Sequence, residues 1–180
     1  YADVMLSELN RIDKIVSDLL ILAKPEIGQF EKTDLKTVIE NVVSLLNTQA
    51  IMNNIEIKTD FDGQSFIIEC EPDKLKQVFI NVIKNAIEAS ENNGKITIHT
   101  SWLDNEQVLM QVQDEGIGIP PERIPKLGEP FYSTKEKGTG LGLMMCNKII
   151  KAHNGTIKIT SEESVGTTVH ITLPKSPDNV

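Results

Sequence analysis

The stretch DEGIG at residues 114–118, followed by GTGLGL at residues 138–143, decides the fold that we expect for this chain. The first loop opens with a lone carboxylate at the end of an apparent strand, and the second directly precedes an apparent helix. Glycine is the default residue of any turn that needs a positive φ, so either loop alone is a weak signal. The two loops in this order predict the two walls of a nucleotide pocket.

The carboxylate of Asp114 is the expected contact to the base. A single acceptor there can receive a hydrogen bond from an exocyclic amine such as that of adenine, and Gly116 and Gly118 would let a flat ring approach the backbone. The alternative is that Asp114 only caps its own turn.

The second loop is the expected phosphate site, because free N–H groups and the positive end of the helix dipole favour phosphate oxygens. It is not a Walker loop, since no Gly-Lys-Ser/Thr follows, and it does not fit the dinucleotide fingerprint. The residues that we expect around the phosphates are Gly138, Thr139, Gly140, Leu141, Gly142 and Leu143.

An upstream helix, expected from Pro72 to about Ser90, carries a polar stripe of Asn81, Asn85 and Glu88. Asparagine inside a helix is unfavourable by roughly 0.6 kcal/mol relative to alanine, so two of them one turn apart invite a functional explanation. An amide oxygen suits Mg²⁺, which takes one or two protein oxygens together with nucleotide phosphates. We therefore expect Asn85 to ligate Mg²⁺, Asn81 to assist it and Glu88 to orient a metal-bound water. The alternative is that all three are solvated surface residues.

Between the two loops, residues 119–137 are expected to form a lid over the nucleotide. Phe131 would anchor the lid against the core, and Lys135 would reach the terminal phosphate and stabilise charge during transfer. Plain solubility is the alternative explanation for Lys135.

Composition limits the possible partners. The chain has 180 residues and a formal net charge of −8, which argues against a nucleic-acid or anionic-membrane binder. No apolar run is long enough to cross a bilayer or to act as a signal peptide. Cys70 and Cys146 have no metal-ligand or redox spacing, so we expect buried side chains in a reducing, cytoplasmic compartment.

Residues 1–24 predict a helix that packs against another helix. Its apolar residues recur at alternating spacings of four and three, at Met5, Leu9, Ile12, Val16 and Leu19, and Pro25 and Gly28 would end it. Partner helices on another copy of the chain, or outside it, would cover this seam. The alternative is that the helix only caps the core of its own domain.

The remaining pattern predicts a two-layer α/β sandwich of class α/β. Thr33 or Asp34 can cap a helix over residues 35–52, and a last helix is expected over 141–151. Strands are expected over residues 55–61, 66–70, 95–102, 107–114, 156–161 and 167–173, with a hairpin around Asp104-Asn105.

Four motifs resemble, in order and spacing, the N, G1, F and G2 boxes of bacterial sensor histidine kinases, and Asn85-Ala-Ile-Glu-Ala resembles the sporulation and nitrogen-regulatory type. They are Asn81-x-x-x-Asn85-Ala86, Asp114-x-Gly116-x-Gly118, Pro130-Phe-Tyr-Ser-Thr-Lys135 and Gly138-Thr-Gly-Leu-Gly142-Leu. The resemblance implies a Bergerat-type ATP-binding domain over residues 30–180 that binds ATP and Mg²⁺. It also implies that residues 1–25 are the second helix of a dimerisation and phosphoacceptor hairpin, and that Thr167 helps to fix the adenine.

The same resemblance implies function and partners. The γ-phosphate would pass to a hairpin histidine and then to a response regulator, in a homodimer held by the hairpin helices. It leaves room for a protein inhibitor docked on the hairpin, and any membrane contact would come from regions outside this chain. The family's acceptor lies in a His-Glu motif, which none of His99, His153 and His170 matches, so we expect the accepting histidine outside these 180 residues.

Three functions stay open on these residues. The first is a histidine kinase catalytic region. The second is an ATP hydrolase or serine kinase with the same pocket, which Glu88 would suit as a water-activating carboxylate. The third is a nucleotide-gated interaction module without chemistry.

Overall fold

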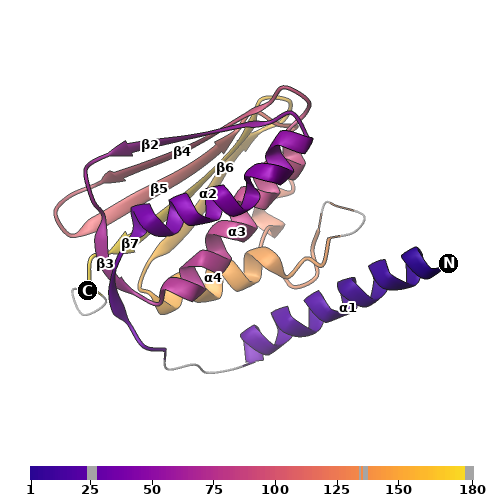
Figure 1. The fold of residues 1–180 in the computed structure, drawn as a ribbon, viewed down its shortest axis with the longest axis horizontal. Coiled ribbons are helices and arrows are strands. Elements are labelled where there is room, and N and C mark those ends of the chain that lie inside the picture. Colours follow the sequence, from indigo (N-terminus) through magenta and orange to yellow (C-terminus); the bar gives the residue numbers. More distant parts are fainter. Residues whose placement is uncertain (24–27, 134, 136–137, 177–180) are drawn as a thin grey trace.

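The computed structural model describes residues 1–23, 28–133, 135 and 138–176, and it consists of a five-stranded sheet with three helices on one face (Figure 1). The elements in chain order are α1 (Ala2–Ala23), β1 (Glu31–Asp34), α2 (Leu35–Met52), β2 (Glu56–Asp62), β3 (Ile67–Cys70), α3 (Pro72–Ala89), β4 (Lys95–Trp102), β5 (Gln107–Asp114), the 3₁₀ turn η1 (Ile124–Lys126), α4 (Gly142–Ala152), β6 (Thr156–Glu162) and β7 (Gly166–Pro174). The predicted helices and strands are all present, with ends shifted by a residue or two.

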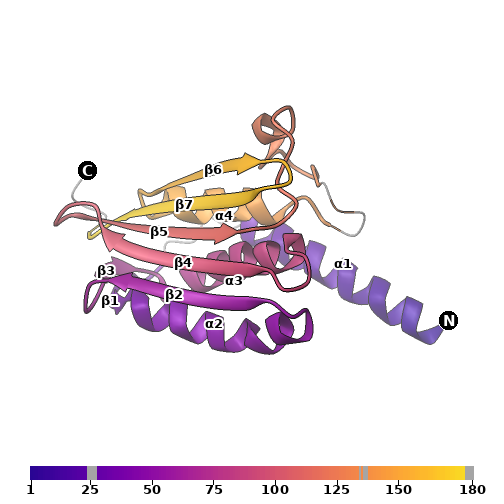
Figure 2. The same ribbon diagram turned by 90° about the horizontal axis from the view of Figure 1, so that it is seen from above.

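The sheet has the strand order β2-β4-β5-β7-β6 (Figure 2). Neighbouring strands are antiparallel except β2 and β4, which are parallel and are joined through α3. The strands on either side of Asp62-Gly63 do not pair with each other, because β3 pairs with β1 in a separate two-stranded sheet. Strand β1 is not expected from the sequence, since Glu-Lys-Thr-Asp has no apolar alternation and only its pairing with β3 makes it a strand.

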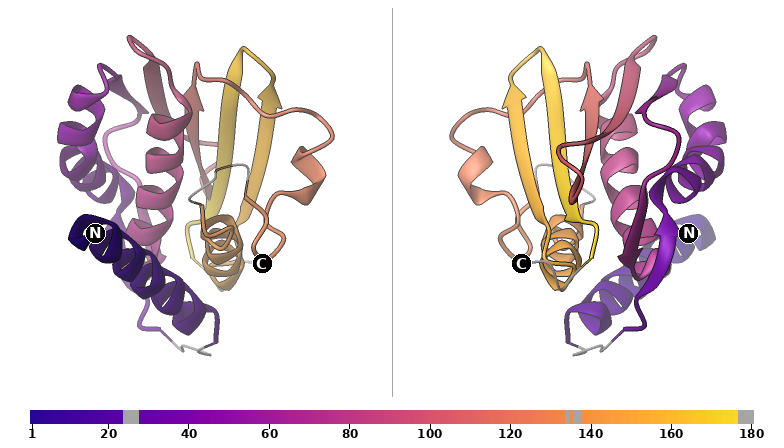
Figure 3. Two further views of the ribbon diagram at one scale, coloured as in Figure 1. Left: turned by 90° about the vertical axis from the view of Figure 1, so that its right-hand side faces the viewer. Right: turned by 90° about the vertical axis from the view of Figure 1, so that its left-hand side faces the viewer.

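Apolar side chains between the sheet and the helices form the core. On α3, Phe79 and Ile83 are fully buried, and on β5 every second residue is buried. This alternation places one face of the sheet against α2, α3 and α4 and leaves the other face open, as Figure 3 shows from two sides. The predicted two-layer α/β sandwich is therefore confirmed.

The start of α2 is fixed by Asp34, one of the two residues predicted to cap it. Its Oδ1 accepts hydrogen bonds from the Lys36 N–H at 3.0 Å and from the Phe66 N–H at 2.9 Å. One carboxylate thus caps the helix and attaches it to the segment before β3.

Helix α1 extends away from the rest of the molecule and meets it mainly at α4 (Figure 1). Its C-terminal end is held by Lys148, whose Nζ donates to the carbonyl oxygens of Ile21 and Leu22. Nearby, Asp18 is only 7% exposed, and its Oδ2 has no hydrogen-bond partner among the described residues. Burial raises the pKa of Asp18, although the charge of Lys14 opposes this.

The predicted apolar seam of α1 is not covered by the domain. The five seam residues are all exposed: Met5, Leu9, Ile12, Val16 and Leu19. The domain therefore leaves this seam exposed, while Ile21 near the C-terminal end of the helix packs against the core. The expected end at Pro25 lies outside the described residues.

Both cysteines are buried and free, as expected. Burial raises the pKa of the Cys70 thiol to about 11 and that of Cys146 to about 12. Among the described residues, no helix combines the length and the apolar character needed to cross a lipid bilayer.

Candidate nucleotide site

Asp114 ends β5 and is only 6% exposed. Its Oδ1 accepts hydrogen bonds from the Gly116 N–H at 2.9 Å and the Thr167 N–H at 3.3 Å. Burial raises the pKa of Asp114, and these two hydrogen bonds offset the effect only in part. No protein partner for Oδ2 is found within the described residues, so one carboxylate oxygen remains available to a ligand.

The loop after Asp114 is joined to the elements on both sides of it. The Ile117 N–H donates to the Ala89 carbonyl at the end of α3, and the Ser164 N–H donates to the Ile117 carbonyl. A Cβ on Gly116 would stand 2.2 Å from the Ala89 oxygen, and one on Gly118, whose φ is +69°, would stand 2.0 Å from the oxygen of Glu162. The two glycines are thus needed for close approach of protein backbone, which differs from the expected role of admitting a flat ring.

A hydroxyl that the sequence reasoning missed lies at the same place. Ser161 Oγ accepts from the Ile119 N–H at 2.8 Å, donates to the Gly166 carbonyl at 2.9 Å and lies 2.7 Å from Thr167 Oγ1. Thr167 in turn is the strand partner of Asp114. The only sequence signal for Ser161 is its place on the strand before Gly166-Thr167, in a hairpin whose register the sequence does not specify.

The polar stripe on α3 forms as predicted and receives a lysine from the lid segment. Asn85 Nδ2 donates to Asn81 Oδ1 at 3.1 Å. Lys135 Nζ donates to Asn85 Oδ1 at 3.1 Å and forms an ion pair with Glu88. Residues expected to act together are therefore in contact, although Lys135 is 47 positions from Glu88 in the chain.

The oxygens on this stripe suit a hard cation that takes its other ligands from phosphates and water. Asn85 Oδ1 and the Glu88 carboxylate already share one cation, the ammonium group of Lys135. Among the described residues there is no group of three His, Cys, Asp or Glu side chains that could hold a metal by itself. Mg²⁺ suits such a place, since it usually takes one or two protein oxygens and completes its shell with phosphates and water.

The second glycine loop packs against both the stripe and the lid segment. A Cβ on Gly142 would stand 2.4 Å from Asn81 Nδ2, and one on Gly140, whose φ is +69°, would stand 2.3 Å from the backbone of Phe131. The Leu141 N–H donates to Thr139 Oγ1 at 3.4 Å. The loop and the asparagine pair are thus adjacent at the start of α4, where backbone N–H groups face away from the helix.

The expected anchoring role of Phe131 is wrong. Its side chain is 66% exposed, because its backbone has a φ of +63° and packs against Gly140 while the ring points outward. The lid segment is seated instead through η1, which lies beside the β6 edge of the sheet (Figure 3). Thr134 of the predicted F box lies outside the described residues.

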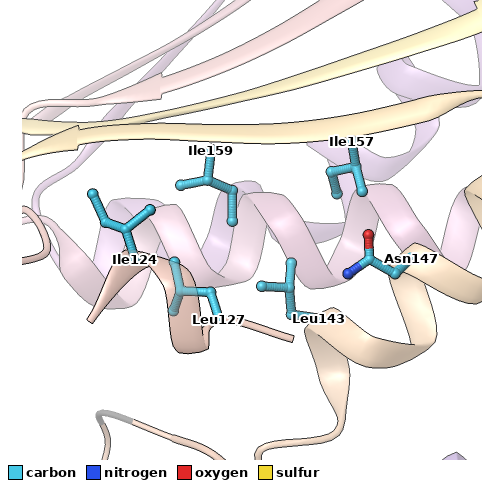
Figure 4. Close-up of a pocket in the computed structure, with 6 residues that line it drawn as sticks. All are labelled: Ile124, Leu127, Leu143, Asn147, Ile157 and Ile159. Carbon is cyan, nitrogen blue, oxygen red and sulfur yellow. The ribbon is translucent and has the colours of Figure 1, made fainter. Parts of the chain in front are cut away.

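A pocket beside η1 is lined mainly by aliphatic residues and contains few of the residues predicted to bind the nucleotide. Figure 4 shows its lining from η1 and the residue after it, from α4 and from β6, namely Ile124, Leu127, Leu143, Asn147, Ile157 and Ile159. Of the residues predicted to contact the nucleotide, Leu143 alone is in this lining. Leu143 therefore faces η1, whereas Leu141 is 1% exposed and anchors the glycine loop in the protein.

None of the histidines stands beside the stripe on α3. His99 and His170 lie in β4 and β7, where they contact Asp60 and Gln111 respectively. His153 is 3% exposed at the end of α4. That the accepting histidine lies outside these residues stays a prediction.

Comparison with known proteins gives a consistent result. Residues 70–177 match the family model described as histidine kinase-, DNA gyrase B- and HSP90-like ATPase. Sporulation kinase E of Bacillus subtilis (strain 168) is 47% identical over 97% of this chain, which spans 24% of that relative. The chain thus covers about a quarter of the length of this curated relative.

Two solved structures share the fold. The nucleotide-free catalytic domain of histidine kinase ThkA is 35% identical, with a TM-score of 0.77 over 84% of this chain and 99% of that domain. Histidine kinase ThkA in complex with response regulator protein TrrA is 31% identical, with a TM-score of 0.85 over 100% of this chain and 52% of that one. The second match includes α1, so the helix is part of the shared architecture.

Proposed function

Because this chain belongs to the histidine kinase-, DNA gyrase B- and HSP90-like ATPases, and within them to the catalytic regions of bacterial sensor histidine kinases, we propose that it binds Mg-ATP and donates the γ-phosphate to a histidine. That histidine would lie on a dimerisation hairpin of which α1 (Ala2–Ala23) is the second helix. Residues 1–25 would thus belong to the hairpin and residues 30–180 to the catalytic domain.

This proposal rests on one observation. The groups that suit the base of a nucleotide and the groups that suit its phosphates lie at two separate places in the fold. The available oxygen of Asp114 lies at the end of β5 beside Thr167, where it suits an exocyclic amine. Asn85 lies on α3, with Lys135 and the glycine loop before α4 beside it, and this group suits phosphates. The loop that follows Asp114 is tied to the end of α3 through Ala89 and so connects the two receptors.

At the phosphate end, we assign roles to the side chains and to the backbone N–H groups. Asn85 would hold Mg²⁺ through its amide oxygen, Asn81 would fix the orientation of that amide, and the bound ion would supply positive charge that stabilises the transferring phosphoryl group. Lys135 would leave Asn85 and Glu88 and donate to the terminal phosphate. The N–H groups from Gly138 to Leu143 would hold the remaining phosphate oxygens.

Hydrolysis is the second candidate function. Glu88 is paired with Lys135 in this structure, but Lys135 would leave it to reach the terminal phosphate, and the freed carboxylate could then accept a proton from water. The similarity to sensor histidine kinases, which extends over α1, favours phosphotransfer over hydrolysis.

The proposed partners follow from α1 and from the relatives. The exposed seam of α1, from Met5 to Leu19, would pack in a homodimer with the hairpin helices of a second copy. A response regulator would accept the phosphoryl group, since the similar kinase ThkA has been solved in complex with the response regulator protein TrrA. The relative named sporulation kinase E favours a role in sporulation signalling.

The test is to mix the chain with a separate hairpin polypeptide that carries the accepting histidine, together with ATP labelled on the γ-phosphate. We expect acid-labile label on the hairpin, and none on the same hairpin with its histidine replaced by glutamine. Release of free phosphate alone would support a hydrolase. ATP binding without any turnover would support a non-catalytic module.

A further inference from the structure

The hydrogen bonds around Ser161 determine which way the hydroxyl proton of Thr167 points. Ser161 Oγ has three partners: the Ile119 N–H at 2.8 Å, the Gly166 carbonyl at 2.9 Å and Thr167 Oγ1 at 2.7 Å. A serine hydroxyl has one proton to donate and two lone pairs that can accept. The three contacts therefore use its whole hydrogen-bonding capacity.

Two of these partners have no choice of role. A carbonyl oxygen only accepts, so the contact with Gly166 takes the single proton of Ser161. A backbone N–H only donates, so the Ile119 contact takes one lone pair. The contact with Thr167 is then complete only if Thr167 donates its own proton to the second lone pair of Ser161.

With its proton committed to Ser161, Thr167 can offer a ligand only lone pairs. Thr167 is the strand partner of Asp114, whose Oδ2 is also an acceptor. We propose that Ser161 is a positioning residue that makes Thr167 an acceptor, so that the base site presents two acceptors and selects a 6-amino purine over a 6-oxo purine. This inference rests on the proposed binding of ATP.

The chemistry of the two purines explains the selection. The 6-amino group of adenine has two N–H donors, which can be shared between Asp114 and Thr167 or reach one of them through water. The 6-oxo group of guanine or hypoxanthine is an acceptor and would face two further acceptors without a proton between them. Sites that leave buried polar groups unpaired reject the wrong ligand strongly.

The test compares Ser161→Ala with the parent for three nucleotides: ATP, purine riboside triphosphate, which lacks the amine, and inosine triphosphate, which carries the 6-oxo group. Because Ser161 also supports the loop at Ile119, the variant can weaken all three. We expect ATP to lose about three- to tenfold more affinity than purine riboside triphosphate, since only ATP uses the acceptor on Thr167. Inosine triphosphate should gain relative to ATP, because the freed Thr167 hydroxyl can then donate.

Three further variants separate positioning from a structural effect. Ser161→Thr retains a hydroxyl and should retain the preference for ATP, and Thr167→Val should lose it even if Ser161→Ala does not fold. Ser176→Ala is the matched control, since Ser176 donates to Glu69 at 3.0 Å in another part of the molecule and should leave all affinities unchanged.

The outcomes distinguish the proposed role of Ser161 from the proposed binding of ATP. Equal losses for ATP and purine riboside triphosphate in Ser161→Ala, or an unchanged preference in Thr167→Val, would overturn the role of Ser161 and leave ATP binding standing. A parent protein that binds none of the three nucleotides would overturn the proposed function and this inference together.

Discussion

Replacing Gly142 by alanine should weaken the binding of Mg-ATP while leaving the stability of the protein nearly unchanged. Gly142 is the first residue of α4, and alanine stabilises a helix interior by about 0.8–1 kcal/mol relative to glycine, less in the first turn. The new Cβ would stand 2.4 Å from Asn81 Nδ2, roughly 1 Å closer than an ordinary van der Waals contact. The amide of Asn81 ends a side chain and can rotate away, so the clash itself costs little.

The rotation nevertheless breaks the 3.1 Å hydrogen bond between Asn85 and Asn81, which is worth about 0.5–1.5 kcal/mol. The gain and the loss nearly cancel, so we expect the melting temperature of Gly142→Ala to stay within a few degrees of the parent. The amide of Asn85 loses its support, and we expect Mg-ATP to bind roughly tenfold more weakly, which corresponds to about 1.4 kcal/mol. Thermal unfolding and calorimetric titration measure the two quantities.

Gly155→Ala is the matched control, with the opposite expected result. Its Cβ would stand 2.4 Å from the carbonyl oxygen of Thr172, which is backbone and cannot rotate away. We expect a loss of stability of about 1–3 kcal/mol with unchanged affinity in the folded protein, because Thr172 is distant along β7 from Thr167. In an Asn81→Ala background, Gly142→Ala should cost no further affinity. Undiminished Mg-ATP binding by Gly142→Ala alone would refute the role given to the asparagine pair.

Three other predictions address single side chains. Asn85→Ala should abolish Mg²⁺-dependent ATP binding, and an unchanged calorimetric affinity would remove Asn85 as the metal ligand. Asp114→Asn replaces an acceptor by a donor and should reduce the discrimination between ATP and GTP in competition binding; equal selectivity in variant and parent would remove Asp114 from the base contact. His153 donates from Nδ1 to the Ile149 carbonyl and accepts the Glu71 N–H at Nε2, and its burial lowers its pKa, so the folded state favours the neutral ring. The contribution of the neutral ring to stability is therefore complete above about pH 6.5 and is lost as the pH falls below that value. Between about pH 7 and pH 5, the melting temperature of His153→Gln should therefore fall less than that of the parent. Equal falls in melting temperature would contradict this prediction.

Much of the fold follows from local pattern. The alternation in β5, the buried face of α3 and the capping carboxylate of Asp34 are all properties of short segments, so the sequence predicts them well. Strand β1 does not follow from its own residues, because it is a strand only by pairing with β3. The partners of β2 and β3 are equally non-local, and the turn at Asp62-Gly63 gives no information on them.

The candidate site is likewise predictable from the sequence only in part. The stripe of Asn81, Asn85 and Glu88 is visible because asparagine is unusual in a helix interior. The contact of Lys135 with this stripe and the place of Ser161 beside Thr167 depend on long-range packing and on strand register. The exposure of Phe131 depends on a single backbone torsion, which sequence pattern does not predict for a phenylalanine.

The parallel pairing of β2 with β4 has a consequence for the order of folding. The hairpins β4–β5 and β6–β7 join neighbouring segments and can form early, whereas β2 reaches β4 only after α3 has been placed across the sheet. The nucleotide receptors draw on α3, β5 and β7 together, so they exist only once α3 has been placed across the sheet. A nucleotide that binds there binds only molecules in which this step is complete and stabilises them by mass action, so the rate at which binding capacity appears during refolding measures the placement of α3.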